Sequence, residues 1–165
     1  MNRTWILVAD SARARVFERD RAGALIELGC YTNPEARDGT RGMTTDRPPT
    51  VNESMGFARH ALEPHTSRRE KVAATFARAL REVLDRGHVE QRFDRLVLVA
   101  PARFLGDLHS AFGKHLRAAV VAEVRRDFTH LTPAKLTVQL AHVGLPAAVP
   151  AADAARHTAP RRNLA

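Results

Sequence analysis

The first thirty residues constrain the fold more than any other part of the chain. A continuous apolar run at residues 5–9 (WILVA) predicts a strand that is buried on both faces. Apolar residues return at 13–18 and 25–30, and short segments containing Asp, Ser and Gly separate the three runs. Such short segments are typical of tight turns between antiparallel strands. The chain therefore begins with a predicted three-stranded meander, with Trp5 in the core and Cys30 buried on the third strand.

After a long loop, helical and extended patterns alternate. Ser67 and Glu70 have the spacing of a capping box, in which each side chain satisfies a free amide at a helix start. Apolar residues then recur at helical spacing as far as Leu84, and Gly87 is predicted to end this helix. A second fully apolar run at 95–100 predicts another buried strand near the centre of a sheet.

The last third of the chain repeats this alternation. Pro101 is placed to open a helix that Gly113 ends, and residues 117–124 (RAAVVAEV) suit a strand. Thr132 and Pro133 have the pattern of a cap and a first helical residue, so they begin a third helix. Strands that are joined by helical crossovers run parallel in one sheet. The predicted fold class is therefore α/β, with a ribonuclease-H-like mixed sheet and three helices.

The length of 165 residues suffices for one domain with a full core. We predict that residues 1–143 form this α/β domain and that residues 144–165, rich in Ala and Pro, form a mostly disordered tail. Loop 31–66 interrupts the domain and contains four prolines and three glycines. Because long loops without secondary structure are commonly functional, loop 31–66 is the predicted binding surface.

The net charge of +8 raises the hypothesis of a polyanionic partner such as RNA. The excess is spread along the chain, and a compositional bias toward arginine explains it equally well. No apolar stretch approaches the roughly 20 residues of a membrane-spanning helix, and the amino terminus lacks the apolar core of a signal peptide. The predicted location is therefore the cytoplasm. Cys30 is the only cysteine, which excludes an intrachain disulfide and a cysteine-based zinc site.

Five segments resemble a known bacterial family. They are WILVADSARARVFE at the amino terminus, TDRPPT and GFARHALEP in the loop, RLVLVAPARFLGDL in the second half, and DFTHLTPAKL at the last helix. Together these segments are similar to the host attachment proteins, which are described as required for attachment to host cells. The resemblance implies an α/β fold and a function related to attachment.

The family is in turn similar in fold to the central domain of archaeal and eukaryotic peptide-chain release factors. In those factors the loop between the meander and the first helix bears a Gly-Gly-Gln motif, which promotes peptidyl-tRNA hydrolysis. The corresponding loop 31–66 has no Gly-Gly pair and no glutamine. The resemblance therefore implies a release-factor-like domain without this hydrolytic motif. It leaves a ribosome- or RNA-associated factor as the alternative function.

Five arginines are candidate phosphate or RNA contacts. A guanidinium group donates two parallel hydrogen bonds to a phosphate, which suits recognition of a polyanion. Five acidic residues share loop 31–66, so internal ion pairs are the alternative interpretation of the same charges. The candidates are Arg41, Arg47 and Arg59 in the loop, and Arg68 and Arg69 at the start of the next helix.

Asp46, His60, Glu63 and His65 form a candidate polar cluster in the same loop. Two histidines and a carboxylate are ligands that zinc uses, but the helical H-E-x-x-H spacing is missing. Ser54 lacks the G-x-S-x-G surroundings of a hydrolase nucleophile. We therefore predict a polar loop surface and assign no catalytic residue, no metal and no cofactor. A hydrolase stays the third hypothesis.

A ribonuclease-H-like nuclease needs several carboxylates around divalent metal ions. Asp10 ends the first predicted strand, but Pro101 follows the strand at 95–100 and no carboxylate stands there. The sequence is therefore best interpreted as a non-catalytic binding protein that acts through loop 31–66 on an unknown protein partner. An exposed edge strand of the meander leaves a homodimer open.

Overall fold

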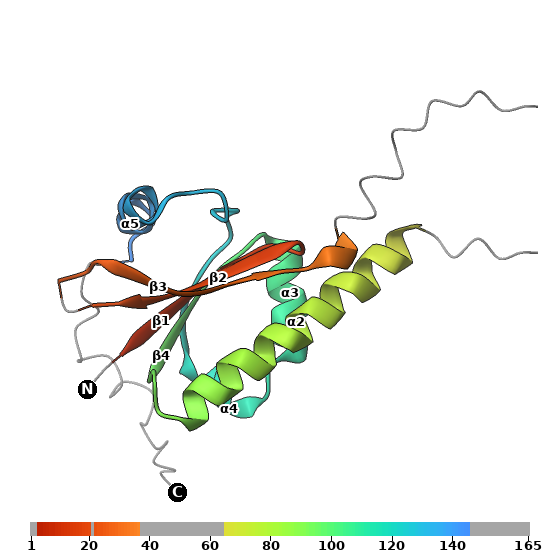
Figure 1. The fold of residues 1–165 in the computed structure, drawn as a ribbon, viewed down its shortest axis with the longest axis horizontal. Helices are drawn as coiled ribbons and strands as arrows, with labels where there is room; N and C mark the ends of the chain where they lie inside the picture. The colour runs from red at the N-terminus through yellow and green to blue at the C-terminus, as the bar shows by residue number, and fades with distance from the viewer. Residues whose placement is uncertain (1–2, 21, 37–64, 146–165) are drawn as a thin grey trace, which may run out of the picture.

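The meander and the two later strands form one five-stranded sheet (Figure 1). The computed structural model describes residues 3–20, 22–36 and 65–145 of the chain. The strand order is β3-β2-β1-β4-β5, so the two fully apolar runs lie at its centre. The strands are β1 (Thr4–Ala9), β2 (Arg13–Arg19), β3 (Leu25–Thr32), β4 (Arg95–Val99) and β5 (Val120–Val124).

The strand directions confirm the predicted mixed sheet. β1 pairs antiparallel with β2, and β2 pairs antiparallel with β3. β1 pairs parallel with β4, and β4 pairs parallel with β5, because helices carry the chain back between these strands. The chain thus has the predicted α/β fold, and its five-stranded mixed sheet is consistent with the ribonuclease-H-like class.

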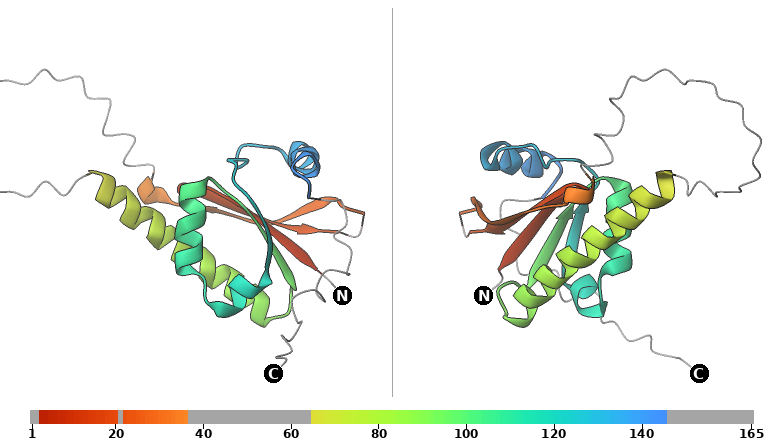
Figure 2. Two further views of the ribbon diagram at one scale, coloured as in Figure 1. Left: turned by 180° about the vertical axis from the view of Figure 1, so that it is seen from behind. Right: turned by 45° about the vertical axis from the view of Figure 1, so that its right-hand side comes forward.

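Helices cover both faces of the sheet (Figures 1 and 2). Successive side chains of a strand point to opposite faces, so all six residues of β1 are buried. Trp5 and Leu7 pack on the face that α2, α3 and α4 cover, whereas Ile6 and Val8 pack on the face that α5 covers. Besides a short helical segment at residues 34–36, the helices of the described part of the chain are α2 (His65–Val89), α3 (Ala102–Ala111), α4 (Lys114–Ala119) and α5 (Pro133–His142).

Helix α2 begins earlier than the sequence predicts. Its first residue is His65, so Ser67 lies inside the helix, and the prediction of a capping box is wrong. Pro64 directly precedes this start, and proline favours helix beginnings because its fixed φ is already helical. The carboxylate of Glu70 instead accepts a hydrogen bond from Arg103 on α3. This ion pair ties the beginning of α2 to its neighbour.

Helix α2 also ends later than predicted. Gly87 lies inside the helix, two residues before its last residue, Val89. The chain then closes in a Schellman motif, in which the N–H of Arg92 donates to the carbonyl of Gly87 at 2.9 Å. Gln91 takes the left-handed conformation that this motif requires, with φ of 53°. Gly87 is therefore not a helix stop, and its role comes from its contact with Trp5.

An additional short helix, α4, replaces the beginning of the last predicted strand. Residues 117–119 are helical, and β5 starts only at Val120. Leu116 and Ala119 are buried in the core from this helix. The guanidinium of Arg117 donates to the carbonyl of His109 at 2.7 Å and 3.1 Å. The helical turn thus gains core contacts and a closing hydrogen bond, which outweigh the strand preference of this segment.

The edges of the sheet are β3 and β5. Trp5 is in the core as predicted, but Cys30 on β3 is exposed, and the prediction that it is buried is wrong. The reason is the position of β3, because an edge strand is covered less completely than a central one. Pairing of this edge with a second copy stays a prediction. Most of the predicted tail, residues 146–165, lies outside the described residues.

Candidate functional site

Three parallel strands, β1, β4 and β5, end at the same edge of the sheet. We define this carboxyl edge as residues 10–13, Asn33 and the segment 125–132. In open α/β sheets, ligands bind in the crevice outside the carboxyl ends of the strands. Loop 31–66 starts at the same edge, because the last residue of β3 pairs with the first residue of β2.

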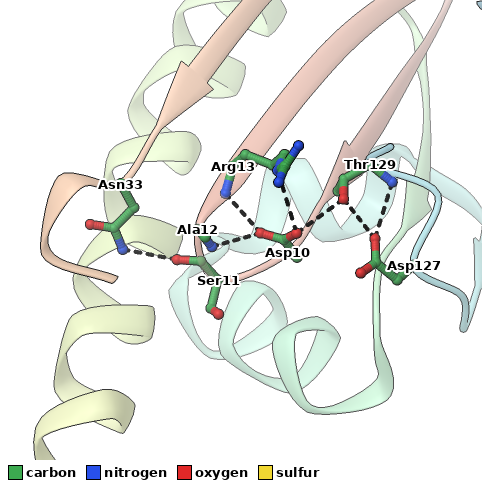
Figure 3. Close-up of polar contacts among 7 residues, drawn as sticks. All are labelled: Asp10, Ser11, Ala12, Arg13, Asn33, Asp127 and Thr129. Carbon is green, nitrogen blue, oxygen red and sulfur yellow. Dashed lines mark hydrogen bonds and ion pairs between the residues drawn. The ribbon is translucent and has the colours of Figure 1, made fainter. Parts of the chain in front are cut away.

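Asp10 lies at the centre of the carboxyl edge (Figure 3). Its Oδ1 atom accepts hydrogen bonds from the backbone N–H groups of Ala12, at 2.6 Å, and Arg13, at 2.8 Å. A carboxylate that caps its own turn in this way stabilises the tight connection from β1 to β2. The other oxygen, Oδ2, accepts a hydrogen bond from the hydroxyl of Thr129 at 3.0 Å. Asp10 thus joins the meander to the segment before α5.

Thr129 is a buried polar residue of this edge, with 5% of its surface exposed. Its Oγ1 lies 2.7 Å from Oδ1 of Asp127 as well as 3.0 Å from Oδ2 of Asp10. A hydroxyl carries one hydrogen, so Thr129 donates to one of the two carboxylates at a time. The backbone N–H of Thr129 also donates to Asp127, at 3.1 Å. These bonds fix the segment between β5 and α5 against the end of β1.

Asn33 fixes the start of loop 31–66 to the same edge. It is 7% exposed, and its N–H donates to the carbonyl of Ala12 at 2.8 Å. Its side-chain amide donates to the carbonyls of Ser11, at 2.9 Å, and Val72 on α2, at 3.4 Å. One buried amide therefore connects the turn after β1, the beginning of the loop and the helix that follows the loop.

Arg15 holds the segment before α5 at a second point. Its Nη1 donates to the carbonyl of Leu131 at 2.6 Å, while Nε and Nη2 donate to the two carboxylate oxygens of Glu27. The guanidinium also lies over the ring of Phe17, 4.8 Å from its centroid. These hydrogen bonds from Arg15 hold the pKa of Glu27 below its ordinary value. The segment is thus attached to both β1 and β2.

We predict an acid-dependent loss of stability from the Glu27 pair. A carboxylate whose pKa is lowered by folding stabilises the protein above its unfolded pKa, about 4.5, and this contribution disappears as the pH falls through the lower folded pKa. The difference in unfolding free energy between the wild type and Glu27→Gln should therefore be largest near neutral pH and shrink below about pH 4.5. Urea unfolding at a series of pH values measures it. A difference that is constant with pH would contradict the assignment.

We predict that Thr129→Val lowers the free energy of unfolding by about 1–3 kcal/mol. Valine keeps the shape of threonine but leaves the carboxylates of Asp10 and Asp127 without the hydroxyl donor. Thr129→Ser retains the hydroxyl and serves as the matched control, so it should lose much less. Chemical denaturation of the three proteins measures the effect. Equal losses in both variants would show that the methyl group, and not the hydrogen bond, is what matters.

The described residues include only part of the predicted site. Arg68 and Arg69 lie on exposed positions in the first turns of α2, and His65 is the first residue of that helix. The other candidates lie outside the described residues, so their roles stay predictions. They are Arg41, Arg47, Arg59, Asp46, His60 and Glu63.

Sequence reasoning missed the two residues that hold the carboxyl edge together, Thr129 and Asn33. Both follow strands, and Thr129 stands two residues after Asp127, a spacing typical of side-chain-capped turns. That local signal was present. The contact with Asp10 across 119 residues was not readable, because it depends on how β5 is placed in the sheet.

Hydrogen bonds within the chain engage the carboxylates of the carboxyl edge. In the part of the chain that the structure describes, no group of three or more His, Cys, Asp or Glu side chains could hold a metal ion. Asp10 accepts from two backbone amides and from the hydroxyl of Thr129, and its Oδ2 also lies 3.9 Å from Nε of Arg13. Oδ1 of Asp127 accepts from the backbone amide and the hydroxyl of Thr129. None of the described helices is long and apolar enough to cross a membrane.

A comparison with protein families matches residues 5–140 to the family described as "Protein required for attachment to host cells". The match runs from the beginning of β1 to the end of the apolar face of α5 and includes the whole carboxyl edge. A search of curated proteins finds no match.

Proposed function

The chain belongs to the family of proteins required for attachment to host cells, and from this premise we propose that it is a binding protein. Its partner, a protein, docks on the carboxyl edge of the sheet and on loop 31–66, which leaves from that edge. The binding protein supports attachment without catalysing a reaction, and its place of action is the cytoplasm. Attachment is then supported indirectly, through the partner.

The observation that carries this proposal is the anchoring of the carboxyl edge. Asn33 binds the turn after β1 and the helix after the loop, and Thr129 binds Asp10 from the opposite side. A binding surface gains affinity when its parts are held in place before the partner arrives, because less conformational entropy is lost. The buried hydrogen bonds of this edge supply such pre-organisation at the point where the long loop begins.

An exchange of the loop tests the proposal. In the variant, residues 37–64 are replaced by a Gly/Ser linker of equal length, which retains both anchored ends. The control is the chain ended after Leu145, which removes residues 146–165 and leaves the loop intact. We expect the loop variant to unfold at nearly the wild-type temperature but to lose attachment of the cells to their host, while the control keeps it. Wild-type attachment by a folded loop variant would refute a role for the loop.

Cell fractionation tests the indirect route. Detection of the protein only in the cytoplasmic fraction, together with loss of attachment when the protein is removed, is the expected result. Protein on the cell surface or in the medium would instead favour direct contact with the host.

A second proposal is association with RNA or the ribosome, as in a release-factor-like domain that lacks Gly-Gly-Gln. The exposed arginines at the start of α2 favour it, since Arg68 and Arg69 make no ion pair with other described residues. Co-sedimentation with ribosomes at low and high salt tests it, because phosphate contacts strengthen as salt is lowered. Absence of the protein from the ribosome fraction at low salt would eliminate this proposal.

A further inference from the structure

The outer face of α2 carries an excess of positive charge along its whole length. The helix has six Lys and Arg residues against three Asp and Glu residues. Phe76, Leu80 and Leu84 are buried against the sheet, whereas the arginines lie on exposed positions. Arg68 and Arg86 are 18 residues apart, which corresponds to about 27 Å along a helix. Arg78 lies between them, on an exposed position of the same helix.

Two of the three acidic residues of α2 are already engaged in ion pairs. Asp85 accepts a hydrogen bond from Arg81 at 2.9 Å, and Glu70 pairs with Arg103 from α3. Within the described ranges, Arg86, like Arg68, makes no ion pair. The positive charge on this face is therefore only partly neutralised by the protein itself, and it complements an extended polyanion.

We propose that the outer face of α2 is a track that binds the phosphate backbone of single-stranded RNA through Arg68, Arg78 and Arg86. This inference rests on the second proposal above and names the surface that carries it. The arginine fork binds phosphate in two-point geometry and stacks on bases, so arginines spaced along a helix suit a flexible strand.

The same face does not suit a lipid surface. A helix that lies on a membrane needs an apolar face to insert among the lipid chains. The apolar face of α2 is buried against the sheet, where Phe76 stacks on Phe104 of α3 with ring centroids 6.1 Å apart. Only polar and charged contacts are thus available along most of the outer face, which favours RNA over a membrane.

Two triple variants with equal charge changes test the track. The first combines Arg68→Gln, Arg78→Gln and Arg86→Gln. The second, the control, combines Arg3→Gln, Lys114→Gln and Lys135→Gln, which are exposed and lie outside both α2 and the carboxyl edge. Binding of a fluorescent single-stranded RNA oligonucleotide is measured by anisotropy over a range of salt concentrations. Thermal unfolding confirms that both variants fold.

We expect the α2 variant to bind the RNA more weakly. The magnitude of its slope of log K against log salt should be smaller by about two, because three phosphate contacts are lost and each contributes roughly 0.7 on a single strand. The control should keep the wild-type slope. If the wild type binds no RNA even at low salt, both the second proposal and the track fail. If the wild type binds RNA and the α2 variant has the affinity and salt slope of the wild type or of the control, only the track fails. Binding to anionic vesicles without binding to RNA would overturn the track in favour of a lipid surface.

Discussion

Replacing Gly87 by alanine is expected to lower the free energy of unfolding by about 1–3 kcal/mol. A Cβ atom at this position would lie 2.6 Å from both Cη2 and Cζ3 of Trp5, closer than real Cβ atoms approach any atom. Alanine in a helix normally gains about 0.5–1 kcal/mol over glycine. For a net loss of stability, the cost of the clash with Trp5 must exceed this gain in helix propensity. The sign of the measured change in unfolding free energy therefore shows which of the two effects is larger.

Trp5 has little freedom to move away from a new methyl group. It is 3% exposed, and its ring stacks on Phe93 with centroids 4.6 Å apart. The guanidinium of Arg92 lies 5.3 Å from the same ring. Because the indole is held from several sides, relief of the clash requires α2 to shift away from the sheet, which costs packing along the helix.

Gly106 offers a matched control within α3. It too lies inside a helix, but, apart from the neighbouring residues and backbone of its own helix, no atom lies within 4 Å of the position of its Cβ. Gly106→Ala should therefore stabilise the protein by roughly 0.5–1 kcal/mol. Urea unfolding of both variants and the wild type gives the comparison. If Gly87→Ala stabilised the protein as much as Gly106→Ala does, the ring of Trp5 would move away from the new methyl group at little cost, which would contradict the proposed clash.

The central strands could be predicted because their burial requires a recognisable run of apolar residues in the sequence. A strand that is covered on both faces needs apolar side chains at consecutive positions, as in β1 and β4. The parallel direction followed from the helical segments between strands. The fold class could thus be inferred from two short apolar runs and from the alternation of helices and strands.

The errors at Gly87 and at residues 117–119 have one physical cause. Each was inferred from a local preference that tertiary contacts override. Glycine at 87 is selected by the approach of Trp5 and not by a helix end. At residues 117–119, burial of Ala119 favours the helical conformation over a strand. Local preferences are worth less than about 1 kcal/mol per residue, so one buried contact reverses them.

The carboxyl edge could be predicted only in part for a related reason. Asp10 was recognisable as the residue that ends a buried strand, and loop 31–66 was recognisable by its composition. The partners of Asp10 and of the loop, Thr129 and Asn33, become neighbours only when the strand order is known. Polar contacts between distant segments produce no periodic pattern in the sequence, so they cannot be predicted from such a pattern.

Leu136→Ala is expected to cost about 2–5 kcal/mol, the largest effect of any substitution considered. Leu136 is fully buried on α5, in the cluster that contains Ile6 and Val97 of the central strands. Among the described elements, α5 is the helix that covers this face of the sheet, so few neighbouring side chains can relax into the cavity left by the leucine. The lost transfer free energy and the cavity therefore add.

Val138→Ala is the matched control, because Val138 lies on the same helix but is 53% exposed. It should change stability by less than about 0.5 kcal/mol, as exposed substitutions usually do. Urea unfolding measures both variants, and amide hydrogen exchange shows whether β1 and β2 lose protection when α5 is weakened. We expect loss of protection there, because the hydrogen bonds from Thr129 and Arg15 join the segment before α5 to these strands. A loss below about 1 kcal/mol in Leu136→Ala, with unchanged exchange in β1, would mean that α5 contributes little to holding the carboxyl edge in place.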